Sequence, residues 1–119
     1  MTPRVLCTLC YVLAFVSVRT VAAVANPTPH VASEAQAETL ALDAIARHHL
    51  TSLAPACLAL MSEDLTNGWS IDVHELHDEK CGGDPETSPR LFTIDVDATT
   101  GAMTTDALDP ADGEMQSLD

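Results

Sequence analysis

The sequence is poor in aromatic and basic residues. Its 119 residues include one Trp, one Tyr and two Phe, and five Lys or Arg stand against 18 Asp or Glu. The formal net charge of −13 argues against nucleic acids and anionic lipids as partners, because both bind basic surfaces. So few aromatic side chains leave a small domain short of the groups that fill a core. A further constraint on the fold is therefore expected.

Catalytic motifs are also lacking. The sequence has no Gly-x-Ser-x-Gly element, and Gly82-Gly83 is not followed by the Lys-Ser or Lys-Thr of a phosphate-binding loop. His74 and His77 are three residues apart in an expected strand, which places them on opposite faces of a sheet. We therefore expect neither an enzyme nor a cofactor.

The first 25 residues have the pattern of a secretory signal peptide. A positively charged start at 1–4 precedes an apolar run at 5–18, and Ala-Val-Ala at 23–25 fits a cleavage site. The apolar run has about 14 residues, short of the ~20 that a membrane span requires. Cleavage after residue 25 would leave a secreted or periplasmic chain without a stable membrane span.

The chain beginning at Asn26 is more acidic than the whole sequence. Removing Arg4 and Arg19 leaves three basic residues against 18 acidic ones, a formal charge of 3 − 18 = −15. Such a charge favours a cationic protein or a metal ion as partner, or serves solubility alone.

Cys57 and Cys81 are the only cysteines that remain after residue 25. Two cysteines in an exported chain usually form a disulfide. The loop that they would close has about 25 residues, which corresponds to ~3.5 kcal/mol of stabilisation. We expect a structural disulfide here.

One helix is expected, after an extended leader at 26–32. Ser33 and Gln36 fit a capping box, and residues 34–50 are rich in Ala, Leu, Glu and Gln. One apolar stripe recurs at helical spacing: Ala37, Leu40, Ala41, Ala44, Ile45 and His48.

Four strands are expected after the helix. Alternating apolar and polar residues or flanking turn signals place them at 57–63, 69–77, 90–96 and 102–106. The predicted fold is α+β: an N-terminal helix packed on a four-stranded antiparallel meander in a domain of residues 33–107. Residues 108–119 have the composition of a disordered acidic tail.

The exposed face of this sheet is expected to be acidic. The two tight turns suggest a register that puts Asp72 directly opposite Asp95, with Asp97 and Asp106 nearby. Like charges across a sheet destabilise it by tenths of a kcal/mol up to ~1 kcal/mol. This face is therefore either simply solvated or a surface for a basic partner or a cation.

The loop at 78–90 is a second candidate interaction site. It is long, carries Cys81 near its start and ends in a strand, and it contains Asp84, Glu86 and Arg90. These three charged side chains are expected to reach toward a partner.

Two segments resemble known proteins. The strand Phe-Thr-Ile-Asp-Val-Asp at 92–97, followed by Ala-Thr-Thr-Gly-Ala-Met at 98–103, is similar to the ending of PepSY-like domains. The segment 81–92 resembles a stretch found in small exported proteobacterial proteins of unknown function. The resemblance covers about residues 34–106. It implies a non-catalytic binding or inhibitory module, because PepSY domains are thought to restrain peptidases.

Three functions follow as expectations. The first is an exported binding module, such as an inhibitor or immunity protein against a basic cell-wall hydrolase or peptidase. The second is a calcium-binding envelope protein that uses Asp72, Asp95, Asp97 and Asp106. The third is an envelope protein with a structural role. The oligomeric state stays open.

Overall fold

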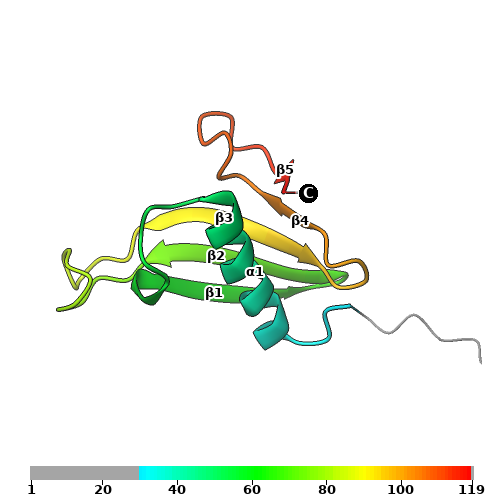
Figure 1. Cartoon of the computed structure of the whole chain (residues 1–119), viewed down its shortest axis with the longest axis horizontal. Coiled ribbons are helices and arrows are strands. Elements are labelled where there is room, and N and C mark those ends of the chain that lie inside the picture. Colours follow the sequence, from blue (N-terminus) through cyan, green and yellow to red (C-terminus); the bar gives the residue numbers. More distant parts are fainter. Residues whose placement is uncertain (1–29, 119) are drawn as a thin grey trace, which may run out of the picture.

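The computed structural model describes residues 30–118, which form one helix packed on a five-stranded antiparallel sheet (Figure 1). The predicted α+β class is confirmed, with one strand more than expected. The predicted signal peptide at 1–25 and most of the predicted leader at 26–32 lie outside the described residues. In the described part of the chain, no helix has the length and apolar character needed to cross a bilayer.

Helix α1 spans Glu34–His48 and begins as its sequence predicts. The Ser33 hydroxyl accepts a hydrogen bond from the backbone N–H of Gln36 at 3.3 Å. The Gln36 side-chain oxygen in turn accepts from the N–H of Ala32 at 2.7 Å, one residue before the usual capping-box position. The helix ends at His49, which adopts the left-handed conformation (φ 52°) and donates its N–H to Ile45.

A short 3-10 turn, η1 (Pro55–Cys57), leads from the helix into the sheet. The strands pair in chain order and are β1 (Leu58–Leu65), β2 (Gly68–Glu75), β3 (Arg90–Asp97), β4 (Met103–Thr105) and β5 (Gln116–Ser117).

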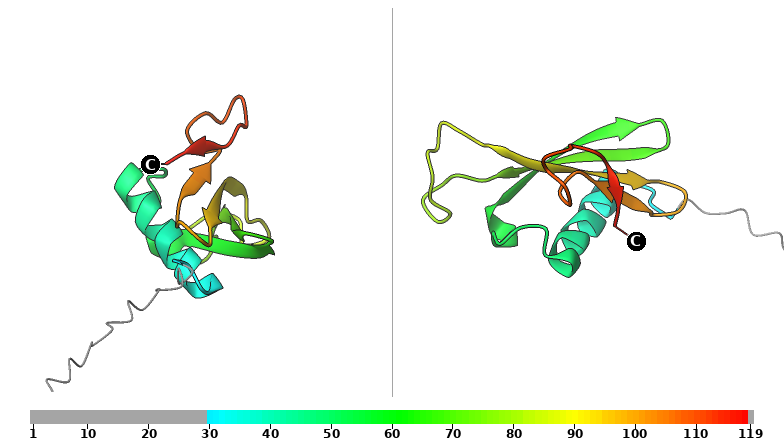
Figure 2. Two further views of the ribbon diagram at one scale, coloured as in Figure 1. Left: turned by 90° about the vertical axis from the view of Figure 1, so that its right-hand side faces the viewer. Right: turned by 90° about the horizontal axis from the view of Figure 1, so that it is seen from above.

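The core lies between α1 and one face of the sheet, called here the inner face (Figure 2). The helix contributes mainly small side chains, Ala37, Ala41 and Ala44, which let it lie close to the strands. The sheet contributes buried residues at the expected alternating positions: Ile71, Val73, Phe92, Ile94, Val96 and Met103. Trp69, which belongs to the same alternation, is only partly buried. Within residues 30–118, no helix covers the opposite, outer face.

The prediction of a disordered tail from residue 108 is wrong for residues 116–118. Strand β5 pairs with β4, and Leu118 is only 5% exposed, with its N–H donated to the Met103 carbonyl at 3.0 Å. The acidic composition belongs to the connecting loop. The pairing of β5 with the edge of β4 brings Leu118 into the hydrophobic core.

The predicted register between β2 and β3 is wrong by two residues. Asp72 lies opposite Thr93, and Asp95 lies opposite Ser70. The register is set at the end of the sheet where β1 turns into β2 and β3 turns into β4, called here the hairpin end. There Gly68 pairs with Asp97 so closely that a Cβ on Gly68 would lie 1.9 Å from the Val96 carbonyl oxygen. A shift of two residues keeps every side chain on its predicted face. The expected repulsion between Asp72 and Asp95 is therefore replaced by other contacts.

Candidate interaction site

The Cys57–Cys81 disulfide holds one end of the sheet and confirms the predicted pairing. The two Cα atoms are 5.5 Å apart. The N–H of Leu76 also donates to the Cys57 carbonyl at 2.8 Å, so residue 57 still pairs with the chain just after β2. The segment 76–89, called here the Cys81 loop, starts at this point and projects from the sheet (Figure 1).

The Cys81 loop is folded on its own carboxylates. Asp78 Oδ1 accepts the N–H groups of Lys80 at 2.9 Å and Cys81 at 2.7 Å. Asp84 Oδ1 accepts the N–H of Glu86 at 3.0 Å, and the Glu86 side chain is exposed. Asp84 is thus a structural residue of the turn, whereas Glu86 is presented to solvent.

His77 ties this loop back to β2. Its Nε2 lies 2.8 Å from Glu75 Oε2, and its Nδ1 lies 2.9 Å from the Asp84 carbonyl oxygen. Both partners are acceptors, so both contacts are hydrogen bonds at once only when each ring nitrogen carries a proton. The hydrogen bond to Glu75, followed by that to the Asp84 carbonyl, raises the pKa of His77. The ring lies against Gly83, where a Cβ would come within 2.5 Å of it.

The His77 ring also contacts Thr87. The sequence did not predict this contact, because His77 was assigned to a strand. Thr87 Oγ1 is 3.1 Å from His77 Nδ1, so Thr87, His77 and Glu75 have the residue types of a catalytic triad. When both ring nitrogens carry a proton, however, Nδ1 has no lone pair to accept one from Thr87. The Thr87 hydroxyl itself donates to the Asp84 carbonyl at 3.1 Å. The grouping ties the Cys81 loop to β2 through the contacts of His77.

On the outer face, Arg90 draws two of the predicted acidic residues together. Its Nη2 is 2.6 Å from Asp106 Oδ2, and its Nε is 3.4 Å from Asp72 Oδ1. Thr93 donates its hydroxyl to Asp72 and its backbone N–H to Asp106, the latter at 2.8 Å. Arg90 therefore joins β2, β3 and the end of β4, and does not extend from the loop as the sequence suggested.

Asp106 is stabilised in its charged form by this arrangement. Burial raises its pKa, but the hydrogen bonds from Arg90 and from the Thr93 N–H outweigh that effect, and the net pKa lies below the ordinary value. Asp106 is consequently ionised at neutral pH and acts as the counter-ion of Arg90.

Asp95 and Asp97 lie apart from this cluster, at the hairpin end. Asp95 Oδ1 accepts the Ser70 hydroxyl at 2.6 Å. Asp97 Oδ1 accepts the N–H of Thr100 at 2.8 Å, its hydroxyl at 3.0 Å and the N–H of Thr99 at 2.9 Å. These hydrogen bonds, the Thr100 N–H first, lower the pKa of Asp97. Both side chains line an open hollow of about 580 Å³.

This division bears on the calcium hypothesis. The four predicted ligands form two separate pairs, one of which already holds Arg90. Across residues 30–118, no group of three or more His, Cys, Asp or Glu side chains is placed to hold a metal ion. No arrangement in the described chain therefore favours cation binding over the other functions.

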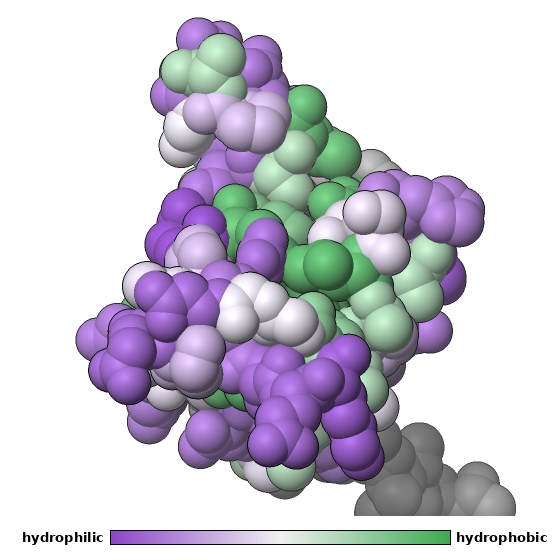
Figure 3. All heavy atoms as spheres, turned by 90° about the vertical axis from the view of Figure 1, so that its left-hand side faces the viewer, coloured by the Kyte–Doolittle hydropathy of each residue, from purple (hydrophilic) through white to green (hydrophobic). Residues whose placement is uncertain are grey.

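Two further hollows offer few polar groups that could bind a ligand. Figure 3 shows the end of the molecule that carries the Cys81 loop, where an apolar area is bordered by hydrophilic residues. A hollow of about 100 Å³ between α1 and η1 has apolar walls that include Leu42, Leu53 and Leu58. Of its two polar lining residues, His49 and Thr51, the Thr51 hydroxyl oxygen already accepts the Leu53 N–H at 3.2 Å.

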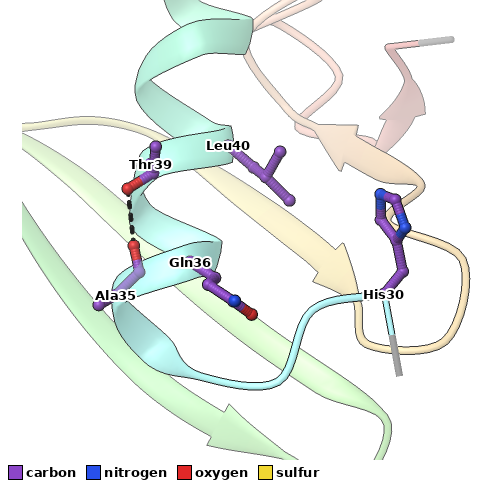
Figure 4. A pocket seen from close by; sticks show the side chains of 5 residues that line it. All are labelled: His30, Ala35, Gln36, Thr39 and Leu40. Carbon is purple, nitrogen blue, oxygen red and sulfur yellow. Dashed lines mark hydrogen bonds between the residues drawn. The ribbon is translucent and has the colours of Figure 1, made fainter. Parts of the chain in front are cut away.

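The second hollow, of about 360 Å³, lies beside the start of α1, between Leu40 and His30 (Figure 4). Two of its three polar side chains are used locally, because Thr39 donates its hydroxyl to the Ala35 carbonyl and Gln36 accepts from Ala32. Neither hollow points to a small-molecule substrate.

The chain matches no protein-family model, no curated protein and no solved structure. The PepSY-like resemblance therefore stays a prediction, and the site has to be interpreted from its own chemistry.

Proposed function

We propose that the protein is an exported, non-catalytic module that binds a basic protein of the cell envelope, namely a cell-wall hydrolase or peptidase that it inhibits. One observation carries this proposal: few basic side chains neutralise the acidic surface. Of the three Lys or Arg residues within 30–118, Arg47 pairs with Asp43 and Arg90 with Asp72 and Asp106. Lys80 is left as the one Lys or Arg in that range without an ion pair.

The remaining acidic side chains include several that form no ion pair with a basic residue. Glu63 and Asp64 are exposed on β1, and Glu79 and Glu86 are exposed on the Cys81 loop. A field of one sign accelerates encounter with partners of the opposite sign and repels acidic competitors. The charge therefore supports recognition of a basic protein in addition to solubility.

The Cys81 loop supports the inhibitory version of the proposal. The disulfide, the Asp78 and Asp84 turns and the His77 contacts fix the loop before any partner arrives. A preorganised loop loses little conformational entropy on binding, as inhibitory loops require. The resemblance to PepSY-like domains agrees with such a role, and the signal-peptide pattern agrees with a site of action outside the cytoplasm.

Capture from an envelope extract tests the proposal. The chain beginning at Asn26 should retain basic hydrolases or peptidases at low salt, and their recovery should fall steeply as salt is raised. Recovered enzymes are then assayed with and without the protein, and inhibition is expected. Recovery of no basic protein, or of basic proteins whose activity is unchanged, would contradict it.

Replacement of residues 82–88 by a Gly-Ser segment of equal length should weaken capture at least tenfold. This replacement removes two negative charges, those of Asp84 and Glu86. The matched control, Asp109→Asn with Asp112→Asn, also removes two negative charges, but from the loop before β5. Equal loss in both variants would mean that charge alone, and not the Cys81 loop, determines binding.

A further inference from the structure

The two edges of the sheet differ in length. Strand β5 forms one edge with two residues, whereas β1 forms the other with eight (Figure 1). All eight residues of β1 pair with β2 on one side, without a bulge. Within residues 30–118, no strand pairs with the other side of β1.

The backbone groups that face this open edge follow from the pairing. The hydrogen bond from the Leu76 N–H to the Cys57 carbonyl makes these two residues a hydrogen-bonded pair. Because such pairs alternate along an antiparallel ladder, the N–H and C=O groups of every second residue point outward. They belong to Leu58, Leu60, Ser62 and Asp64.

Strand β1 carries two acidic residues, Glu63 and Asp64, but it lacks the other features that usually protect an edge. Proline, lysine, a bulge or a covering segment normally prevents another strand from adding there. Here the strand has no proline or lysine, and its outer-face side chains Met61 and Leu65 are 62% and 41% exposed. The edge is therefore long, regular and accessible.

The charges around the edge identify what it would accept. Glu63 lies on the outer face and Asp64 on the inner face, while Glu38 of α1 accepts the Ser62 hydroxyl at 2.8 Å on that same inner side. Helix α1 crosses the strands with its first turn beyond β1, so an added strand would lie beneath it (Figure 1). Acidic groups thus border both faces of the edge, and a second copy of this chain would bring the same charges.

We propose that the open edge of β1 binds an extended, basic segment of the partner, which adds as a sixth strand. This inference rests on the proposed function for the sign of the partner's charge, and it adds a second contact site beside the Cys81 loop together with its mode of binding. Backbone hydrogen bonds along β1 supply affinity, and lysine or arginine side chains facing Glu63, Asp64 and Glu38 supply selectivity.

A defined peptide tests this mode. We would titrate the isotope-labelled chain beginning at Asn26 with a blocked octapeptide of alternating Lys and Val. Binding at low salt should slow hydrogen exchange of the Leu60, Ser62 and Asp64 amides at least tenfold. The control peptide has the same sequence with N-methyl groups on alternate amides, which keeps its charge but prevents strand pairing. It should bind at least tenfold more weakly.

A matched pair of variants tests the same edge from the protein side. Ser62→Pro removes one outward N–H at an edge position, where proline is tolerated, and should weaken peptide binding at least tenfold. Ser62→Ala also loses the hydrogen bond to Glu38 but keeps the N–H, so its binding should stay within twofold of the parent. If Ser62→Pro fails to fold, the N-methylated peptide still decides the question.

Three outcomes would overturn strand addition: equal binding of the N-methylated peptide, protection confined to residues 76–89, or slowed exchange along β1 caused by self-association. The first two leave acidic capture of a basic protein intact. A failed capture experiment together with slowed exchange at β1 would contradict the proposed function and support this binding mode. The two proposals can therefore fail separately.

Discussion

The two ends of the sheet are stabilised by different means. At the hairpin end, the chain turns tightly between β1 and β2 and between β3 and β4, and backbone groups meet directly: Ala98 donates to the Asn67 carbonyl at 2.8 Å. At the other end, the long Cys81 loop is held by a disulfide and by polar side chains such as His77.

The difference has a physical consequence. Close backbone contact at the hairpin end leaves no volume for an added atom, so that end should be sensitive to steric changes. The disulfide end depends on a covalent bond and on a protonated ring, so it should respond to reductant and to pH. The end that presents the candidate inhibitory loop is thus the one that chemical conditions can alter.

Breaking the disulfide should have the largest effect. Cys57→Ser combined with Cys81→Ser should lower the free energy of unfolding by ~3 kcal/mol, because the unfolded chain regains the entropy of a loop of about 25 residues. Urea denaturation measures the change. Reductant should destabilise the parent by a similar amount and leave the double variant unaffected. A loss below about 1 kcal/mol would mean that the polar contacts alone hold this end.

The hairpin end should give the next largest effect. In Gly68→Ala the new Cβ would lie 1.9 Å from the Val96 carbonyl oxygen, so the backbone of β2 or β3 has to move. We expect a loss of about 2–3 kcal/mol in urea denaturation, within the range for overpacking. Asn67→Ala in the same turn adds no atoms and should cost less than about 1 kcal/mol. Similar losses in both variants would contradict a steric origin.

The sequence predicted which residues face the core, because alternation in β2 and β3 is a local property. It did not predict the register, since that depends on the approach of Gly68 to Val96, 28 positions later. Nor did it predict β5, because the acidic residues of 108–115 obscured the one apolar residue, Leu118, that returns to the core.

The candidate site was predictable to a similar extent. The disulfide followed from there being only two cysteines after residue 25. The contacts of His77 did not, because β2 ends at Glu75 and not at residue 77, which frees the ring to turn into the loop. Arg90 was assigned to the loop, but its role depends on Asp72 and Asp106, which lie on other strands.

A smaller effect is expected from the outer-face ion pair, which lies between the two ends. Asp106→Asn should lower the free energy of unfolding at pH 7 by about 1 kcal/mol, since Arg90 is partly exposed. The pKa of Asp106 is lowered on folding, so its contribution is present above the ordinary aspartate value and is lost as pH falls through the folded pKa. Variant and parent should therefore converge in strongly acidic solution. Asp109→Asn, as the control, should show no such difference.

The smallest effect on global stability, and the most informative for the loop, should come from His77. Its pKa is raised on folding, so its stabilising contribution is complete below the ordinary histidine value of about 6.5 and is lost as pH rises through the higher folded pKa. Titration of the His77 ring by NMR should give that raised pKa directly. Above it, Nδ1 or Nε2 loses its proton, so either the Asp84 carbonyl or Glu75 loses its hydrogen bond.

Hydrogen exchange of the Glu86 and Thr87 amides reports the local consequence, because both amides donate to Asp84. Their protection, corrected for the intrinsic pH dependence of exchange, should decrease across the His77 titration in the parent. In His77→Gln these two amides should show low protection at every pH. The control variant His49→Gln, at an exposed histidine, should show the same pH dependence of protection as the parent. If protection in the parent does not change with pH, the disulfide and the Asp84 turn alone keep the loop in shape. Inhibition of a partner would then not depend on pH through this residue.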